Sequence, residues 1–206
     1  MKIKVCGMRE ALNVAEIGKE HPDYMGFIFF PPSPRDCSEM NPDVLKNLPE
    51  GVEPVAVTVN MKPESVMQLV ERYGFRTVQL HGDESPADCR ILQEKGLTVF
   101  KAIGIKGEES LKSLPDYQDY IDMFVFDTSG ASRGGTGRKF DWNLLHGYTG
   151  ETPFLLSGGI GPEDMEVVKG IRHNSFAGID LNSRFEISPA KKDVDLIRKF
   201  FKEIRK

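Results

Sequence analysis

The 206-residue sequence predicts an α/β fold, a single-domain (β/α)8 barrel. Two observations predict it: eight short apolar segments recur along the whole chain, and each is followed by enough residues for a helix. Such alternation implies a parallel sheet, because parallel neighbours need a crossover connection. Eight such units close a TIM barrel, and members of that fold span roughly 200 to 400 residues. The alternative, an open doubly wound sheet, has roughly five or six strands. No linker or internal repeat divides the sequence, so we expect one domain over residues 1–206.

The expected strands are rich in Val, Ile and Phe and are bounded by Gly, Pro or Asp, as buried parallel strands tend to be. In chain order they are Ile3 to Cys6, Tyr24 to Phe30, Glu53 to Val59, Thr77 to His81, Thr98 to Ile103, Met123 to Asp127, Phe154 to Ser157 and Phe176 to Ile179. Three intervening segments carry clear helix signals. Two of them, Pro63 to Tyr73 and Ser85 to Glu94, have a proline near the start and a glycine just beyond the end. The third, Val194 to Ile204, has an apolar stripe opposite its charges.

Composition excludes several classes of protein. A formal net charge of −4 and a pI near 5.7 lack the basic footprint of a nucleic-acid binder. No apolar run approaches the roughly 18 to 20 residues of a membrane span, and the first residues lack a secretion signal. The three cysteines, Cys6, Cys37 and Cys89, have no metal-ligand spacing. We therefore expect reduced thiols, a cytoplasmic location, and neither a disulfide nor a metal.

In barrels of this kind, functional residues lie at the carboxyl ends of the strands and in the loops that follow. Although these positions are far apart in sequence, we expect them to converge on one mouth of the barrel. The rule selects Cys6, the segment after Phe30, Asn60, His81, Asp127, Ser157 with Gly158 and Gly159, and Asp180.

Two of these residues are able to transfer protons. Cys6, at the end of the first strand, is either a small buried apolar residue or a thiolate base. Asp127 closes an apolar run, so it is either a helix cap or a buried acid, and burial favours the protonated, proton-donating form of a carboxyl group. The polar, glycine-rich segment 128–137 follows it. This segment is either surface loop or a lid over the mouth, and its position favours the lid.

Two loops suit a phosphate group. Gly158 and Gly159 end the seventh strand shortly before a helix start, where close backbone approach and exposed N–H groups favour an anion. Phosphate sites in this fold are frequently formed by the loops after strands seven and eight. The eighth-strand loop would contribute Asn182, Ser183 and Arg184.

Arg35 follows the proline-stiffened segment 31–34. It is either a solvated surface arginine or a planar fork for a carboxylate or phosphate.

Six groups of residues each match a motif of one enzyme family, and they occur in that family's order. They are Lys4 to Arg9, Gly26 to Phe29 with Ser33 to Arg35, Val78 to Gly82, Asp127 with Thr128, Gly134 to Gly137 with Phe140 to Trp142, and Leu156 to Ile160. On these residues the chain resembles phosphoribosylanthranilate isomerase over essentially its whole length.

The resemblance implies a cofactor-free isomerase of tryptophan biosynthesis, acting on a phosphorylated small molecule as a monomer or homodimer. It would convert N-(5-phosphoribosyl)anthranilate to 1-(2-carboxyphenylamino)-1-deoxyribulose 5-phosphate by an Amadori rearrangement. The resemblance makes Cys6 the general base and Asp127 the general acid. It implies substrate binding by Arg35 (at the anthranilate carboxylate), His81 and Asp180, and phosphate binding by Gly158, Gly159, Asn182, Ser183 and Arg184.

Two features of the sequence bear on these roles. Where the family usually has Ser-Ser-Gly-Val-Glu after the eighth strand, residues 182–186 read Asn-Ser-Arg-Phe-Glu. Either the turn is kept and Arg184 helps to neutralise phosphate, or the phosphate grip is altered. Lys4 lies two residues before Cys6, on the same side of the strand, and is a candidate for favouring the thiolate.

Other functions fit such a barrel less well. A metal-dependent epimerase needs convergent His and Asp ligands, whereas only one of the four histidines, His81, lies at a strand end. A second type of Amadori isomerase would have an aspartate in place of Cys6. A barrel that only binds a phosphometabolite would lack the acid or the base.

Overall fold

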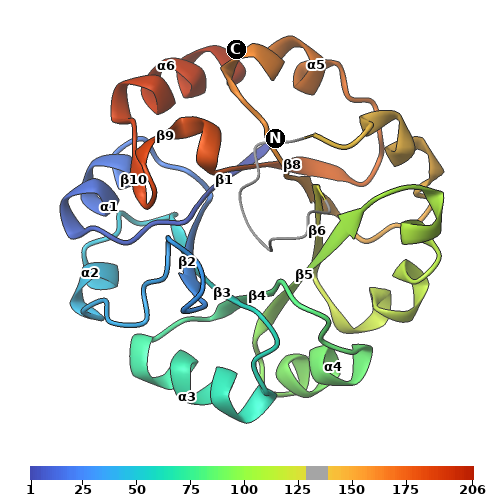
Figure 1. Cartoon of the computed structure of the whole chain (residues 1–206), viewed down its shortest axis with the longest axis horizontal. Helices are drawn as coiled ribbons and strands as arrows, with labels where there is room; N and C mark the ends of the chain where they lie inside the picture. Colours follow the sequence, from blue (N-terminus) through green and yellow to red (C-terminus); the bar gives the residue numbers. More distant parts are fainter. Residues whose placement is uncertain (129–138) are drawn as a thin grey trace.

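The computed structural model describes residues 1–128 and 139–206. Eight parallel strands close a barrel in sequence order, and β8 pairs with β1 (Figure 1). The strands are β1 (Lys2–Cys6), β2 (Tyr24–Phe29), β3 (Glu53–Thr58), β4 (Thr77–Leu80), β5 (Thr98–Ile105), β6 (Met123–Thr128), β7 (Phe154–Leu156) and β8 (Phe176–Leu181). The predicted (β/α)8 barrel is confirmed.

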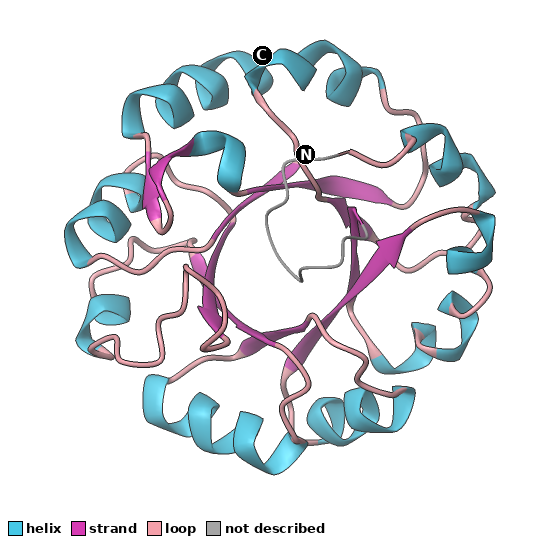
Figure 2. Ribbon diagram, viewed as in Figure 1, coloured by secondary structure: helices cyan, strands magenta, loops and turns pink. Residues whose placement is uncertain are grey.

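Helices surround the barrel (Figure 2). The helices α3 (Pro63–Tyr73) and α6 (Val194–Ile204) have the predicted bounds. The helix α4 (Pro86–Glu94) begins one residue later than predicted, because Ser85 is its N-cap and forms a capping box with Asp88. The other α-helices are α1 (Ala11–Gly18), α2 (Asp43–Lys46) and α5 (Met165–Gly170).

Short 3-10 helices replace a longer helix in several connections. Between β5 and β6 the chain forms three of them, where Pro115 lacks the N–H group that a continuous helix needs. The 3-10 helices are η1 (Glu108–Leu111), η2 (Leu114–Asp116), η3 (Gln118–Tyr120), η4 (Trp142–Gly147), η5 (Pro162–Asp164) and η6 (Ser183–Phe185).

Alternation along the strands divides the buried side chains into two layers. On β1, Ile3 and Val5 belong to the large apolar layer between strands and helices, whereas Cys6 belongs to the smaller cluster inside the barrel. Lys4 is fully buried and shares the inner side with Cys6. The interior of the barrel therefore contains charged groups as well as apolar ones.

Several strand ends differ from the predicted bounds by one or two residues, and two differences bear on the site. The strand β8 extends two residues further than predicted, so Asp180 lies within the strand and not after it. Its register partner on β1 is Lys4, and an ion pair between their side chains links the two strands. The hairpin of β9 (Glu186–Ser188) and β10 (Lys191–Lys192) was not predicted, because strands this short carry no periodic signal. Among the described residues, no helix is long and apolar enough to cross a membrane.

Candidate active site

A cavity lies at the carboxyl ends of the strands. The residues that line this cavity come from segments far apart in the sequence, from Cys6 to Ser183. All the predicted site residues except Arg184 line it: Cys6, Arg35, His81, Asp127, Gly158, Gly159, Asp180, Asn182 and Ser183.

Cys6 lies beside a buried ion pair. The Nζ of Lys4 donates to Oδ2 of Asp180 at 2.8 Å. A Cβ atom added at Gly26 on the adjacent strand would stand 2.7 Å from Cys6 Sγ and 3.1 Å from Lys4 Nζ, so both atoms face this glycine. Burial raises the pKa of the Cys6 thiol, whereas the positive charges of Lys4 and Lys192 act to lower it. The predicted placement of Lys4 beside Cys6 is confirmed.

Asp180 has one carboxylate oxygen bound and one free. Its Oδ1 is buried and has no hydrogen-bond partner within the described part of the chain. Burial raises the pKa of Asp180, and the adjacent Lys4 ammonium only partly offsets this effect. Asp180 also lines the cavity.

Asp127 is held by two neighbours at the mouth. The backbone N–H of Thr128 donates to its Oδ1 at 2.7 Å, and its Oδ2 is 3.2 Å from Nε2 of His81. The amide nitrogen of Gln79 lies 2.9 Å from His81 Nδ1 and donates to it. Neutral His81 then carries its proton on Nε2, directed at Asp127.

Arg35 is not a free surface arginine. Its Nε and Nη2 donate to the carboxylate of Glu186 at 2.7 to 3.1 Å. The Nζ of Lys192 donates to the same carboxylate at 2.5 Å and to Asn182 Oδ1 at 2.7 Å. Burial lowers the pKa of Lys192 to about 8, although Glu186 opposes the shift. Two cations thus share one anion at this side of the cavity.

The loop after β7 has a backbone conformation that requires glycine. Gly158 and Gly159 have φ angles of +87° and +72°, a region that side chains rarely allow. At Gly158 a Cβ atom would also collide with Thr128 and Asp127. Glycine therefore lets this loop lie against the end of β6, next to the predicted acid.

Arg184 lies apart from the other predicted phosphate residues. Its side chain is 48% exposed, and its guanidinium forms an ion pair with Glu163 at 2.8 Å. It does not line the cavity, whereas Asn182 and Ser183 from the same loop do. The arginine that replaces the family's glycine is thus committed to a surface contact between the β7 and β8 loops.

Three residues that contact the predicted site residues were not predicted from the sequence: Glu186, Lys192 and Gln79. Glu186 lies in segment 182–186, which was compared with the family pattern. The sequence did not indicate that Arg35 and Lys192 would be its partners. The predicted lid, apart from Thr128, lies outside the described residues, as does the motif 134–137. Within residues 1–128 and 139–206, no group of three or more His, Cys, Asp or Glu side chains has a geometry that could hold a metal ion.

Comparison with known proteins agrees with the motifs. Residues 3–203 match the family model described as N-(5'phosphoribosyl)anthranilate (PRA) isomerase. The N-(5'-phosphoribosyl)anthranilate isomerase of Parabacteroides distasonis is 44% identical, over 99% of this chain and 93% of that protein.

Solved structures agree with the fold. Dimeric phosphoribosylanthranilate isomerase from Thermotoga maritima, solved as mutually generated monomers, has a TM-score of 0.79 and 27% identity, covering 100% of this chain and 98% of that one. A phosphoribosyl anthranilate isomerase in complex with reduced 1-(o-carboxyphenylamino)-1-deoxyribulose 5-phosphate has a TM-score of 0.80 at the same identity and coverage. The chain belongs to the N-(5'-phosphoribosyl)anthranilate isomerase family.

Proposed function

We propose that the cavity at the mouth of the barrel isomerises N-(5'-phosphoribosyl)anthranilate to 1-(2-carboxyphenylamino)-1-deoxyribulose 5-phosphate, a step of tryptophan biosynthesis. The observation that carries this proposal is that one cavity is lined by both a thiol, Cys6, and a carboxyl group, Asp127. They come from β1 and β6, so a bound sugar has a proton donor and a proton acceptor within reach.

Ring opening is the first step. Asp127 donates a proton to the ring oxygen of the ribose, the bond between C1 and this oxygen breaks, and the amine nitrogen forms a Schiff base with C1. The carboxylate left on Asp127 accepts the N–H of His81, which stabilises the charge that develops.

Proton transfer from C2 is the second step. The Cys6 thiolate takes the proton from C2, and the electron pair moves into a C1–C2 double bond as the iminium is neutralised. The enol then becomes the ketone at C2: the Cys6 thiol gives its proton to C1, and the Asp127 carboxylate takes the proton of the C2 hydroxyl, so that both groups return to their starting states. The positive charge of Lys4 and Lys192 favours the thiolate against the effect of burial. No electrons are gained or lost overall, so an acid and a base suffice and no cofactor is required.

Both ends of the substrate are anionic and have matching groups. Arg35, backed by Lys192, suits the anthranilate carboxylate, and the free Oδ1 of Asp180 suits a sugar hydroxyl. The phosphate is assigned to two loops. The loop after β7 contributes the backbone of Gly158 and Gly159, and the loop after β8 contributes Asn182 and Ser183. This assignment leaves Arg184 outside the phosphate site.

We further propose a single catalytic domain over residues 1–206 that acts as a monomer or homodimer in the cytoplasm. The three cysteines are all unpaired thiols, as expected in a reducing compartment.

The test is the decay of phosphoribosylanthranilate fluorescence on addition of the purified protein, with Cys6→Ala and Asp127→Asn measured alongside. We expect fast decay with the wild-type protein and the loss of most turnover in both variants, while substrate affinity changes little. A folded wild-type protein that binds the compound without turnover would instead indicate a binding barrel.

A further inference from the structure

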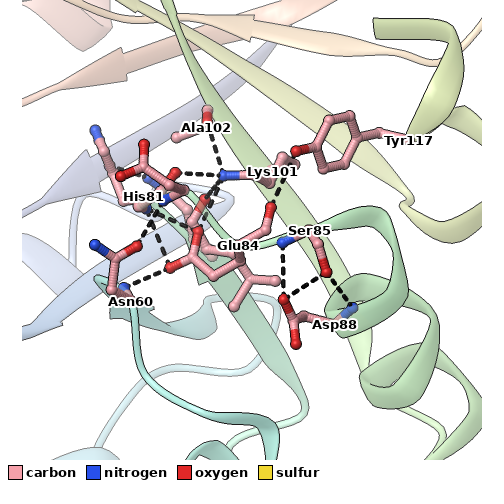
Figure 3. A network of polar contacts seen from close by, with 12 residues as sticks. Asn60, His81, Glu84, Ser85, Asp88, Lys101, Ala102 and Tyr117 are labelled. Carbon is pink, nitrogen blue, oxygen red and sulfur yellow. Dashed lines mark hydrogen bonds and ion pairs between the residues drawn. The ribbon is translucent and has the colours of Figure 1, made fainter. Parts of the chain in front are cut away.

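Another buried ion pair, Lys101 with Glu84, lies behind the cavity wall. On β5, Phe100 and Ala102 belong to the cluster inside the barrel, whereas Val99 belongs to the outer layer, so Lys101 points to the helix side of the sheet. The Nζ of Lys101 donates to Glu84 Oε2 at 3.0 Å, and the two side chains are 1% and 3% exposed (Figure 3).

Lys101 forms hydrogen bonds with the backbone on both sides of His81. Its Nζ donates to the carbonyl oxygens of Leu80 and Gly82, at 3.2 and 2.8 Å. These are the carbonyl groups of the residues immediately before and after His81. Figure 3 shows Lys101 at the hub of these contacts, with His81 directly adjacent.

The glutamate holds the same segment from its amide side. Its carboxylate accepts the backbone N–H of Gly82 at 2.8 Å and that of Asn60 at 2.7 Å. The Asn60 side chain in turn accepts the N–H of Asp83 at 2.6 Å. The loop after β4 is thus tied to the loop after β3 by a fully buried charge.

His81 lies in the middle of the segment that these contacts hold. The backbone of His81 donates to Thr58 at 2.8 Å, and its ring stands between Gln79 at 2.9 Å and Asp127 at 3.2 Å. We propose that the Lys101–Glu84 pair is a positioning device that sets His81 against the carboxyl group of Asp127. This inference rests on the proposed function, in which Asp127 is the acid.

General energetics favour a positioning role over a stabilising one. A buried ion pair is often no more stabilising than an apolar pair of similar volume, since both charges must leave water. Here the charges are directed at backbone groups on either side of one cavity residue. Small displacements of a catalytic group, on the order of 1 Å, reduce turnover by about 100-fold.

The first experiment is steady-state kinetics of Glu84→Gln, which keeps the shape of the side chain and removes its charge. We expect kcat to fall by about 10- to 100-fold. KM should stay within about three-fold of wild type, because Arg35 and the Gly158–Gly159 loop are untouched. A kcat within about two-fold of wild type would overturn the proposal.

A double-mutant cycle distinguishes an effect that acts through His81 from a loss of activity caused by wider disruption of the structure. In a His81→Asn background, Glu84→Gln should cost less than about two-fold in kcat, because the residue it positions is already gone. If the full loss persists in that background, the pair does not act through His81.

Two variants address folding. Glu84→Gln combined with Lys101→Met removes both charges at similar volume, so no buried charge is left uncompensated. It should fold and show the same fall in kcat. Thr77→Val is the matched control, because it removes a partly buried hydrogen bond to Glu53 at the opposite end of β4. It should leave kcat unchanged.

A spectroscopic readout is independent of turnover. The 15N shifts of the His81 ring, assigned with His81→Asn, should show one tautomer in the wild type and a mixture in the neutral double variant. Unchanged shifts would overturn the positioning role. If the wild-type protein does not turn over phosphoribosylanthranilate, the proposed function fails, yet these shifts still test the positioning of His81.

Discussion

Arg35 and Glu186 form a two-pronged ion pair, with Nε and Nη2 of the arginine both donating to the carboxylate. An arginine held this way is fixed in direction before any ligand arrives, so little side-chain entropy is lost on binding. Its charge is nevertheless matched by Glu186, and Lys192 supplies the excess positive charge. In the proposed function, the carboxylate end of the substrate would meet this pre-positioned cluster of two cations and one anion.

Arg35→Ala should raise KM for phosphoribosylanthranilate by about 10- to 100-fold, since a hydrogen bond to a charged group contributes on the order of 1.5 to 3 kcal/mol. The fall in kcat should be smaller, because the acid and the base are untouched. Steady-state fluorescence kinetics measure both constants. Arg35→Lys is the control that keeps the positive charge but removes the planar guanidinium group. Its KM should lie between those of the wild type and Arg35→Ala. An unchanged KM for Arg35→Ala would remove the residue from substrate binding.

Arg184→Ala should change KM by less than about three-fold, because its guanidinium is paired with Glu163 and is half exposed. Ser183→Pro is the contrasting variant. It removes a backbone N–H on the same loop, at a residue that lines the cavity, and should weaken binding of inorganic phosphate as a competitive inhibitor. A large rise in KM for Arg184→Ala would return the arginine to the phosphate site.

The strands and the strand-end residues were predictable because both depend on local pattern. Apolar segments between turn residues locate β1 to β8, and the rule for barrel mouths then selects Cys6, His81 and Asp127 without knowledge of their neighbours.

The pairing of buried charges was not predictable, because it depends on which strands become neighbours. Lys4 and Asp180 are 176 residues apart and meet only because β8 closes the barrel onto β1. The partner of Arg184 was unpredictable for a related reason. Its loop reaches the cavity, but its long side chain turns to Glu163, which belongs to the connection after β7.

Lys4→Met should make the Cys6 thiol less reactive at neutral pH. The ammonium of Lys4 lowers the pKa of Cys6 more than Asp180 raises it, so loss of the lysine raises this pKa further even when Asp180 takes up a proton. The measurement is the rate of alkylation by iodoacetamide against pH, in a Cys37→Ala/Cys89→Ala background. The profile should move to higher pH. Lys2→Met is the control, because Lys2 pairs with Asp23 and should leave the profile in place. A shift to lower pH in Lys4→Met would contradict the role of Lys4.

Lys192 should make the protein more stable as the pH rises above about 8. Burial lowers its pKa from an ordinary 10.5 to about 8 in the folded state. Between these values the unfolded chain binds more protons than the folded one, so the free energy of unfolding increases with pH. The increase is at most about 1.4 kcal/mol per pH unit for one group. The increase ends once the pH exceeds 10.5, the pKa of Lys192 in the unfolded chain.

Urea unfolding at pH 7.5, 8.5 and 9.5 measures this slope. Lys192→Met should be flatter than wild type over that range, because the variant has no proton to release at the site. Lys191→Met changes the adjacent, exposed lysine of the same hairpin and should keep the wild-type slope. Equal slopes in wild type and Lys192→Met would show that Lys192 keeps its proton through this range. The positive charge beside Arg35 would then not depend on pH below about 10, and substrate affinity should be equally insensitive to pH there.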